Sequence, residues 1–226
     1  MNRNICNKTI LKAVSVSIFA VLFYMACDDN GVKVVTPEVT TFVDYRDNRT
    51  YKKVQIGSQI WMAENLKYEA ENSQCDDITW SPYDDPAQNC EEYGRLYDWN
   101  TAMDGVASSS SVPSGVEGVC PVGWHLPSDA EWTILTDFVG ENAGTKLKSR
   151  DFSGAIDLGT PSGTDKYRFS ALPLPSAWIS YWWSSTELVT DEGRAWYRAV
   201  WNRRVDVMRW YDDKHAHFYA VRCVKD

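Results

Sequence analysis

Four cysteines in the body of the chain constrain its fold more than any other feature of the sequence. They are Cys75, Cys90, Cys120 and Cys223. Four cysteines allow three pairings, and we favour Cys75–Cys90 with Cys120–Cys223 over the other two. The first bond would close a small acidic loop, and the second would tie the middle of the chain to its C-terminal end. A zinc site is the alternative, but no Cys-x-x-Cys spacing supports it.

The N-terminal segment decides whether such disulfides can form. A short basic start is followed by an apolar stretch from Ala13 to Met25, which ends in Ala26-Cys27. This is the pattern of a secretory signal, and the stretch is shorter than the roughly 20 residues that span a bilayer. A cysteine directly after the small residue resembles a bacterial lipoprotein signal, which implies cleavage before Cys27 and acylation of that residue. An ordinary signal peptide is the alternative interpretation.

We therefore divide the chain into three parts. Residues 1–26 are the predicted signal peptide, residues 27–44 the lipidated Cys27 with a polar tether, and residues 45–226 one folded domain. Several acyl chains would hold the protein stably on a membrane, so we expect an exported lipoprotein at the outer membrane or cell surface. Export into an oxidising compartment favours disulfides over free thiols.

The composition indicates a folded, acidic domain with many large rings. Charged residues make up 24% and hydrophobic residues 44% of the 226 residues, which is typical of globular proteins. The net charge is −8, and residues 1–27 hold three basic and no acidic side chains, which leaves −11 on the remainder. This argues against nucleic acid as a partner, because phosphate neutralisation needs clustered Lys and Arg. The 11 Trp, 12 Tyr and 7 Phe either fill a core or form a surface that stacks on flat ligands.

The clearest local signals are a hairpin and a capped helix. Residues 51–56 and 59–62 are predicted to pair through a two-residue turn at Gly57-Ser58. Ser128 and Glu131 form a capping box at the start of a helix that ends at Gly140. The predicted buried face of this helix consists of Trp132, Leu135, Phe138 and Val139.

Other segments are assigned more coarsely. We predict a first strand near residues 40–43, a strand-poor loop at 69–93, a short helix at 96–103, a surface loop at 105–118 and one further helical turn at 144–149. Five short strands are predicted at residues 169–172, 182–186, 195–201, 205–210 and 217–224, as an antiparallel meander. Helices early and strands late predict one α+β domain with much irregular chain.

Seven motifs in a fixed order resemble a known family. They are KKVQIGSQIWMAENLKY (52–68), YGRLYDWNTAM (93–103), GVCPVGWHLPSDAEW (118–132), GTKLKS (144–149), FSALP (169–173), WWSSTE (182–187) and AVRCVKD (220–226). Together they are similar to the Fibrobacter succinogenes major paralogous domain, a family of exported bacterial domains that are often carried on lipoproteins. The resemblance covers residues 45–226 and implies location and fold more than chemistry.

A more distant resemblance concerns the fold. The segment GWHLPSDAEW, a later WSST stretch and the terminal VRCV also look like the C-type-lectin-like and formylglycine-generating group. That resemblance implies a single compact α+β domain with short antiparallel strands, one or two helices and its two ends brought together. Formylglycine-generating enzymes bind copper through a nearby cysteine pair, whereas Cys223 is alone in its region. An oxidase is therefore the least favoured function.

Aromatic residues in the C-terminal third are the candidate ligand-binding residues. Because neighbouring strand residues face opposite ways, we expect one of Trp182 and Trp183 to point outward. Trp196 should lie on one strand face and Trp201 on the other. The candidate stacking residues for a sugar ring are Trp182, Trp183, Trp201, Trp210 and Tyr211. An aromatic-rich core is the alternative for all of them.

Acidic and histidine residues are weaker candidates. Asp212 and Asp213 could supply oxygen ligands to calcium, as could Asp76-Asp77 and Asp84-Asp85, although no EF-hand spacing is present. Solvated loop charge is the alternative. His215 and His217 could chelate a metal from one strand face, and His125 is expected to be a hydrogen-bonded core residue. Apart from calcium, no cofactor is expected.

The sequence therefore predicts a non-catalytic binding module. No Ser-His-Asp order, phosphate loop or HExxH motif is present. The favoured ligand is a polysaccharide or another envelope glycan, bound by aromatic side chains of the C-terminal strands. The alternative is a structural or protein–protein adhesion domain at the cell surface.

Overall fold

The hairpin forms one side of a five-stranded sheet. In this computed structural model, which describes residues 24–27, 33–76, 86–152, 163–175 and 178–226, β3 (Val39–Asp44), β4 (Arg49–Ile56) and β5 (Gln59–Met62) pair antiparallel. Ile56 lies opposite Gln59, and Gly57 takes a φ of 62° between them, as a two-residue hairpin turn requires. Tyr51, Val54 and Ile56 are buried. The predicted hairpin and the predicted first strand are confirmed.

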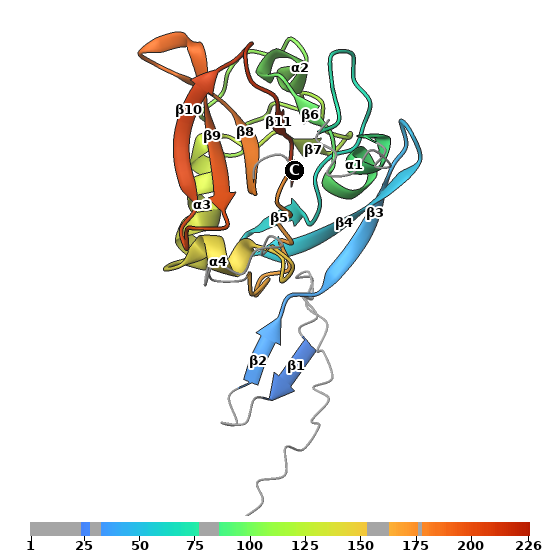
Figure 1. The fold of residues 1–226 in the computed structure, drawn as a ribbon, viewed down its shortest axis with the longest axis vertical. Coiled ribbons are helices and arrows are strands. Elements are labelled where there is room, and N and C mark those ends of the chain that lie inside the picture. The colour runs from blue at the N-terminus through green and yellow to red at the C-terminus, as the bar shows by residue number, and fades with distance from the viewer. Residues whose placement is uncertain (1–23, 28–32, 77–85, 153–162, 176–177) are drawn as a thin grey trace, which may run out of the picture.

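The C-terminal end of the chain completes this sheet. β12 (Val224–Lys225) lies between β5 and β7 (Trp124–His125), and it is antiparallel to both. The strand order is β3-β4-β5-β12-β7. Segments that are far apart in the sequence therefore lie side by side (Figure 1).

A second five-stranded sheet has the order β10-β9-β8-β11-β6. Its strands are β6 (Leu96–Tyr97), β8 (Ile179–Leu188), β9 (Asp191–Trp201), β10 (Met208–Asp213) and β11 (Tyr219–Ala220). β8, β9 and β10 form the predicted antiparallel meander, but β11 is parallel to β8.

Three strand predictions are corrected. Residues 169–172 contribute a single bridge, from Ala171 to Lys148, and β10 begins three residues later than predicted. The predicted strand at 217–224 is two short strands, because β11 pairs in the second sheet and β12 in the first.

Four helices are described: α1 (Pro86–Tyr93), α2 (Trp99–Met103), α3 (Asp129–Val139) and α4 (Ala143–Leu147). α2 and α4 are shorter than the predicted helical segments. α1 was missed, since its region was predicted as loop. The predicted surface loop at 105–118 is corrected in part, because Ser114 and Val116 are buried.

The N-terminal strands form a sheet of their own. β1 (Tyr24–Cys27) pairs with β2 (Lys33–Thr36), and both project from the end of the domain where α4 lies (Figure 1). β1 contains Tyr24 to Ala26, so cleavage before Cys27 would remove most of it. Both five-stranded sheets and both disulfides are built from residues 39–226. Among the described residues, no helix is long and apolar enough to cross a membrane.

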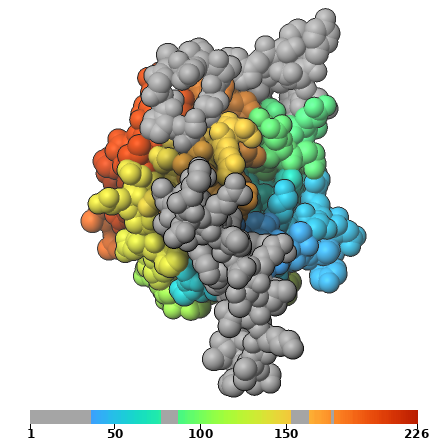
Figure 2. Space-filling view, turned by 90° about the horizontal axis from the view of Figure 1, so that it is seen from below, coloured from blue at the N-terminus to red at the C-terminus, as the bar shows by residue number. Residues whose placement is uncertain are grey.

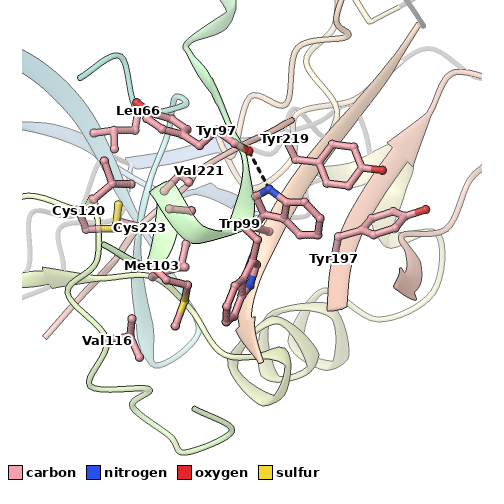
Figure 3. Packing of buried hydrophobic residues seen from close by; sticks show 14 of the residues in the cluster. Leu66, Tyr97, Trp99, Met103, Val116, Cys120, Tyr197, Tyr219, Val221 and Cys223 are labelled. Atoms are coloured by element: carbon pink, nitrogen blue, oxygen red, sulfur yellow. Dashed lines mark hydrogen bonds between the residues drawn. A yellow bond between two sulfur atoms is a disulfide. The ribbon is translucent and has the colours of Figure 1, made fainter. Parts of the chain in front are cut away.

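Large rings fill the interior of the domain. Trp183 donates its indole N–H to the carbonyl of Tyr97 at 2.8 Å, and its ring lies 4.5 Å from that of Tyr219. Figure 3 shows Tyr97 and Tyr219 within this core cluster. On the other side of β8, Trp132 contacts Trp61 and Trp182 at centroid distances of 4.6 and 5.8 Å. Trp61, Trp132, Trp182 and Trp183 are among the largest fully buried side chains, so tryptophan rings fill much of the space between the short elements.

The capping box of α3 joins several distant segments. Ser128 Oγ accepts from the N–H of Glu131 at 3.2 Å, and Glu131 Oε2 accepts from the N–H of Ser128 at 3.0 Å. Glu131 Oε2 also accepts from the backbone N–H of Ser114 at 3.1 Å. Trp132, Leu135 and Val139 form the buried face as predicted, but Phe138 is 55% exposed because it lies at the edge of that face.

His125 is the buried, hydrogen-bonded residue that was expected. Its Nε2 lies 2.8 Å from Glu131 Oε1 and its Nδ1 2.7 Å from Asp226 Oδ1. Burial disfavours the charged ring, but the two carboxylates outweigh that effect and raise the pKa of His125 above its ordinary value.

Both favoured disulfides are present. Cys75 is joined to Cys90, which is 15 residues away, and Cys120 to Cys223, which is 103 residues away. The longer bond is buried and connects the loop before β7 to β12. The structure is thus an α+β domain with two sheets, few short helices and two disulfides.

The loop lengths predict unequal costs of removing the disulfides. Because the unfolded chain gains more entropy when a longer loop opens, Cys120→Ala with Cys223→Ala should lower the free energy of unfolding by about 4–5 kcal/mol, and Cys75→Ala with Cys90→Ala by about 3 kcal/mol. Urea unfolding of the oxidised proteins measures both values. A larger loss from opening the 15-residue loop would contradict the prediction.

The ion pairs of His125 predict a pH dependence. Since the pKa is raised in the folded state, these pairs contribute stability fully below the unfolded pKa of about 6.5, and that stability is lost as the pH rises through the folded pKa. We expect the free energy of unfolding to decline above a pH of about 6.5 in the native chain and to decline less in His125→Gln. An unchanged slope in the variant, measured by urea unfolding across pH, would contradict this.

Candidate functional site

Trp182 and Trp183 are both buried, which corrects the expectation that one of them points outward. Their exposed fractions are 1% and 0%. β8 is the central strand of its sheet, and each of its faces lies against a hydrophobic cluster. Trp182 donates to Asn65 Oδ1 at 2.8 Å, so both indole N–H groups have partners inside the domain. Neither ring is available to stack on a ligand.

Trp210 and Tyr211 lie on the edge strand of the same sheet. Trp210 is 56% exposed, the largest exposed fraction of any described tryptophan. Its ring stacks on that of Tyr211, with 5.4 Å between centroids and 9° between planes. Trp196 meets Tyr211 edge-on at 5.5 Å. We call Trp196, Trp210 and Tyr211 the aromatic edge cluster.

Two arginines hold this cluster. The guanidinium carbon of Arg209 lies 3.5 Å from the ring centroid of Trp196, and that of Arg194 lies 5.5 Å from the ring of Tyr211. Arg209 Nη2 also donates to Asp129 Oδ2 at 2.8 Å. Although burial acts in the opposite direction, Arg209 and Arg198 lower the pKa of Asp129, so its carboxylate stays charged and ties the cluster to α3.

Trp201 does not join the cluster. The alternation of β9 places Trp201 on the sheet face opposite Trp196, as predicted. There it is partly buried against the core cluster that contains Trp183, and the guanidinium of Arg203 lies 6.0 Å from its ring. Among the described residues, no ring contact joins Trp201 to Trp210 or Tyr211, whose stacking partners are each other and Trp196.

Asp212 forms a polar group beside the cluster. Its Oδ2 accepts from the hydroxyl of Tyr219 at 2.7 Å, and its Oδ1 lies 3.2 Å from His217 Nε2. Tyr219 stacks on Tyr181 at 4.7 Å. Burial, together with the charge of Asp212, raises the pKa of Tyr197 to about 12 and that of Tyr219 further, so both hydroxyls stay neutral hydrogen-bonding groups.

The predicted calcium and metal candidates are dispersed. Asp212 lies opposite Ala195 and Asp213 opposite Arg194, so the two carboxylates leave opposite faces of β10. Asp213 Oδ1 accepts the backbone N–H groups of His215 and Ala216. Within the described ranges, no group of three His, Cys, Asp or Glu residues is placed to hold a metal.

The two histidines do not form a chelating pair. His217 faces Asp212, whereas His215 Nδ1 lies 3.1 Å from Asn100 Nδ2. His215 lies in the turn after β10 and His217 just after that turn, so the two side chains do not share a strand face. Asp77, Asp84 and Asp85 lie outside the described residues.

Together these groups offer a flat ring beside hydrogen-bonding side chains. Trp210 and Asp212 are two residues apart on β10, about 7 Å along a strand. An exposed indole next to a carboxylate and an imidazole suits a ligand with both an apolar face and hydroxyl groups. Trp196 was missed as a member because the register that pairs it with Tyr211 is set by the turn between β9 and β10.

A family model described as the Fibrobacter succinogenes major domain matches residues 54–225. No curated protein and no solved structure matches. The C-type-lectin-like fold therefore stays a prediction.

The burial difference predicts different costs for two tryptophan substitutions. Trp183→Ala should lower the free energy of unfolding by about 3–5 kcal/mol, because it leaves a cavity among packed rings. Trp210→Ala should change it by less than about 1 kcal/mol, because the side chain is largely in solvent. Urea unfolding of both variants is the measurement, and equal losses would contradict the assignment of the edge cluster as surface.

Proposed function

Because the chain belongs to the Fibrobacter succinogenes major domain family, we propose that it is a non-catalytic, exported binding module whose aromatic edge cluster binds a polysaccharide or envelope glycan. The observation that carries this proposal is the exposed ring of Trp210, stacked on Tyr211 and two residues from Asp212. A pyranose ring has an apolar face that suits an indole, and its hydroxyls suit a carboxylate.

The location of the chain supports this proposal. The two disulfides indicate an oxidising, extracytoplasmic compartment. We propose in addition that Cys27 is acylated and anchors the domain to the outer membrane or cell surface, where envelope glycans are within reach. Whether binding needs calcium at Asp212 is left to the experiment below.

The chemistry of the cysteines supports binding over oxidation. An oxidase of the formylglycine-generating kind needs two thiols near each other to hold copper. Cys223 is joined to Cys120 instead, and both are buried. A protein partner is the second candidate, because Trp, Tyr and Arg are the residues that dominate protein–protein hot spots, and Arg194 and Arg209 flank the cluster.

Binding to insoluble polymers tests the proposal. The oxidised chain from Asp28 to Asp226 would be incubated with cellulose, xylan and peptidoglycan, with calcium and with chelator. We expect one of the polymers to retain the native chain. Trp210→Ala should lower the affinity for that polymer by about tenfold or more, because it removes a central aromatic contact. Phe138→Ala is the matched control, because Phe138 is 55% exposed but lies on α3, away from the cluster.

The outcomes separate the two candidates. Retention that is lost in Trp210→Ala and kept in Phe138→Ala supports a glycan-binding module, and chelator sensitivity would add a metal to it. No retention on any of the three polymers, or equal loss in both variants, would contradict glycan binding at this cluster and favour a protein partner.

A further inference from the structure

Three surface cavities lined by described residues differ in their charges. In the first, of about 470 Å³, cations are paired with acids: Arg49 with Glu91 at 2.6 Å and Arg95 with Glu69 at 2.8 Å. The second, of about 720 Å³, is acidic. Its carboxylates are Glu69, Glu71, Asp98, Asp104 and Glu117. The third, of about 420 Å³, is basic, and we call it the basic cavity.

Four cations line the basic cavity. They are Lys146, Arg150, Lys166 and Arg168. Among described residues, none of the four forms an ion pair, although Lys146 Nζ donates to the carbonyl of Val139 at 2.9 Å. The carboxylate in the lining, Asp165, is occupied, because its two oxygens accept from the N–H and hydroxyl of Ser170 at 2.8 and 2.9 Å. In a chain of net charge −8, this concentration of unpaired cations favours the approach of an anion.

The basic cavity lies at the end of the domain that carries the tether. Its cations come from α4 and from the segments that follow, and Thr36 at the end of β2 lines it as well. Figure 2 views the molecule from that end, where the yellow residues around α4 lie on the surface. The charge of the basic cavity is thus opposite in sign to that of the acidic cavity beside α2.

The tether places this cavity near the predicted anchor. Thr36 lies nine positions after Cys27, a stretch that spans at most about 30 Å when fully extended. An acylated Cys27 would lie at the membrane surface. The tether would therefore let these cations reach lipid headgroups, and their attraction to anionic lipids acts over about a Debye length, roughly 10 Å at 0.1 M salt.

The side chains suit a phosphate group. Arg150 and Arg168 each present a guanidinium, which can donate two parallel N–H bonds to phosphate oxygens, and the lysines add point charges. Asn142 and Thr164 supply further polar atoms to the lining. We propose that the basic cavity binds the phosphate of an anionic lipid headgroup, so that the domain rests on the membrane that holds its anchor.

Vesicle binding tests this proposal without the acyl chains. The oxidised chain from residue 28 contains β2, both five-stranded sheets and both disulfides, which hold the whole core. It would be sedimented with vesicles of phosphatidylcholine alone and of phosphatidylcholine with phosphatidylglycerol, at low and high salt. We expect binding to the anionic vesicles only, weakened by salt.

A matched pair of variants locates the contact. Arg150→Gln with Lys166→Gln removes two charges whose side chains make no described hydrogen bond, and should lower the partition to anionic vesicles by on the order of tenfold. Lys52→Gln with Lys53→Gln removes the same charge from β4, outside the cavity, and should leave the partition nearly unchanged. A folding check by urea unfolding accompanies both.

A phosphate titration distinguishes a lipid headgroup from a soluble phosphate as the ligand. Inorganic phosphate would be titrated into the native chain and the cavity variant, with thermal stability as the readout. If phosphate stabilises the native chain but not the cavity variant, and the native chain does not bind vesicles, then the ligand is a soluble phosphate and the membrane is rejected as its source. Equal losses in both double variants, or no response to vesicles and phosphate, would overturn the proposal.

Discussion

Residues 219–226 are inserted between segments that are distant in sequence, and the arrangement of both sheets depends on that insertion. β11 lies between β8 and β6, and β12 lies between β5 and β7. Backbone bonds run from Met62 N to the carbonyl of Cys223 and from Leu66 N to that of Val221, at 3.0 and 2.9 Å. The disulfide to Cys120 fixes the same segment covalently. Without this insertion, neither sheet would have five strands.

The insertion also requires a buried cation. The Arg222 side chain lies between the sheets, where burial lowers its pKa to about 9. Its Nε and Nη2 donate to Asn65 Oδ1 at 3.0 and 2.8 Å, Nη1 donates to the carbonyl of Phe169, and the guanidinium lies 4.1 Å from the ring of Phe169. Asn65 Oδ1 also accepts from Trp182. Because a buried guanidinium without these acceptors would be costly, this network fixes the register of the last residues.

The position of β11 determines what remains exposed. Tyr219 on β11 reaches Asp212 on β10 across the sheet, so the polar group beside Trp210 depends on where the C-terminal segment lies. β10 is an edge strand of its sheet, and Trp210 on it is 56% exposed. The aromatic edge cluster and the basic cavity lie on different elements, β9 and β10 for the first and α4 with its following segments for the second.

Local chemistry made part of this structure predictable from the sequence. The turn at Gly57-Ser58 and the capping box of Ser128 and Glu131 need only neighbouring residues, and both were found. The cysteine positions favoured the observed pairing, and the ordered motifs indicated the family. The sequence could not tell whether Trp182 and Trp183 are exposed, because strand alternation assigns relative faces but not what covers each face. Tertiary structure alone decided three further features. They are the strand order, the register that pairs Trp196 with Tyr211, and the position of Lys146 beside Arg150, Lys166 and Arg168. Each depends on contacts between segments that are distant in the sequence, and local sequence patterns do not indicate which distant segments meet.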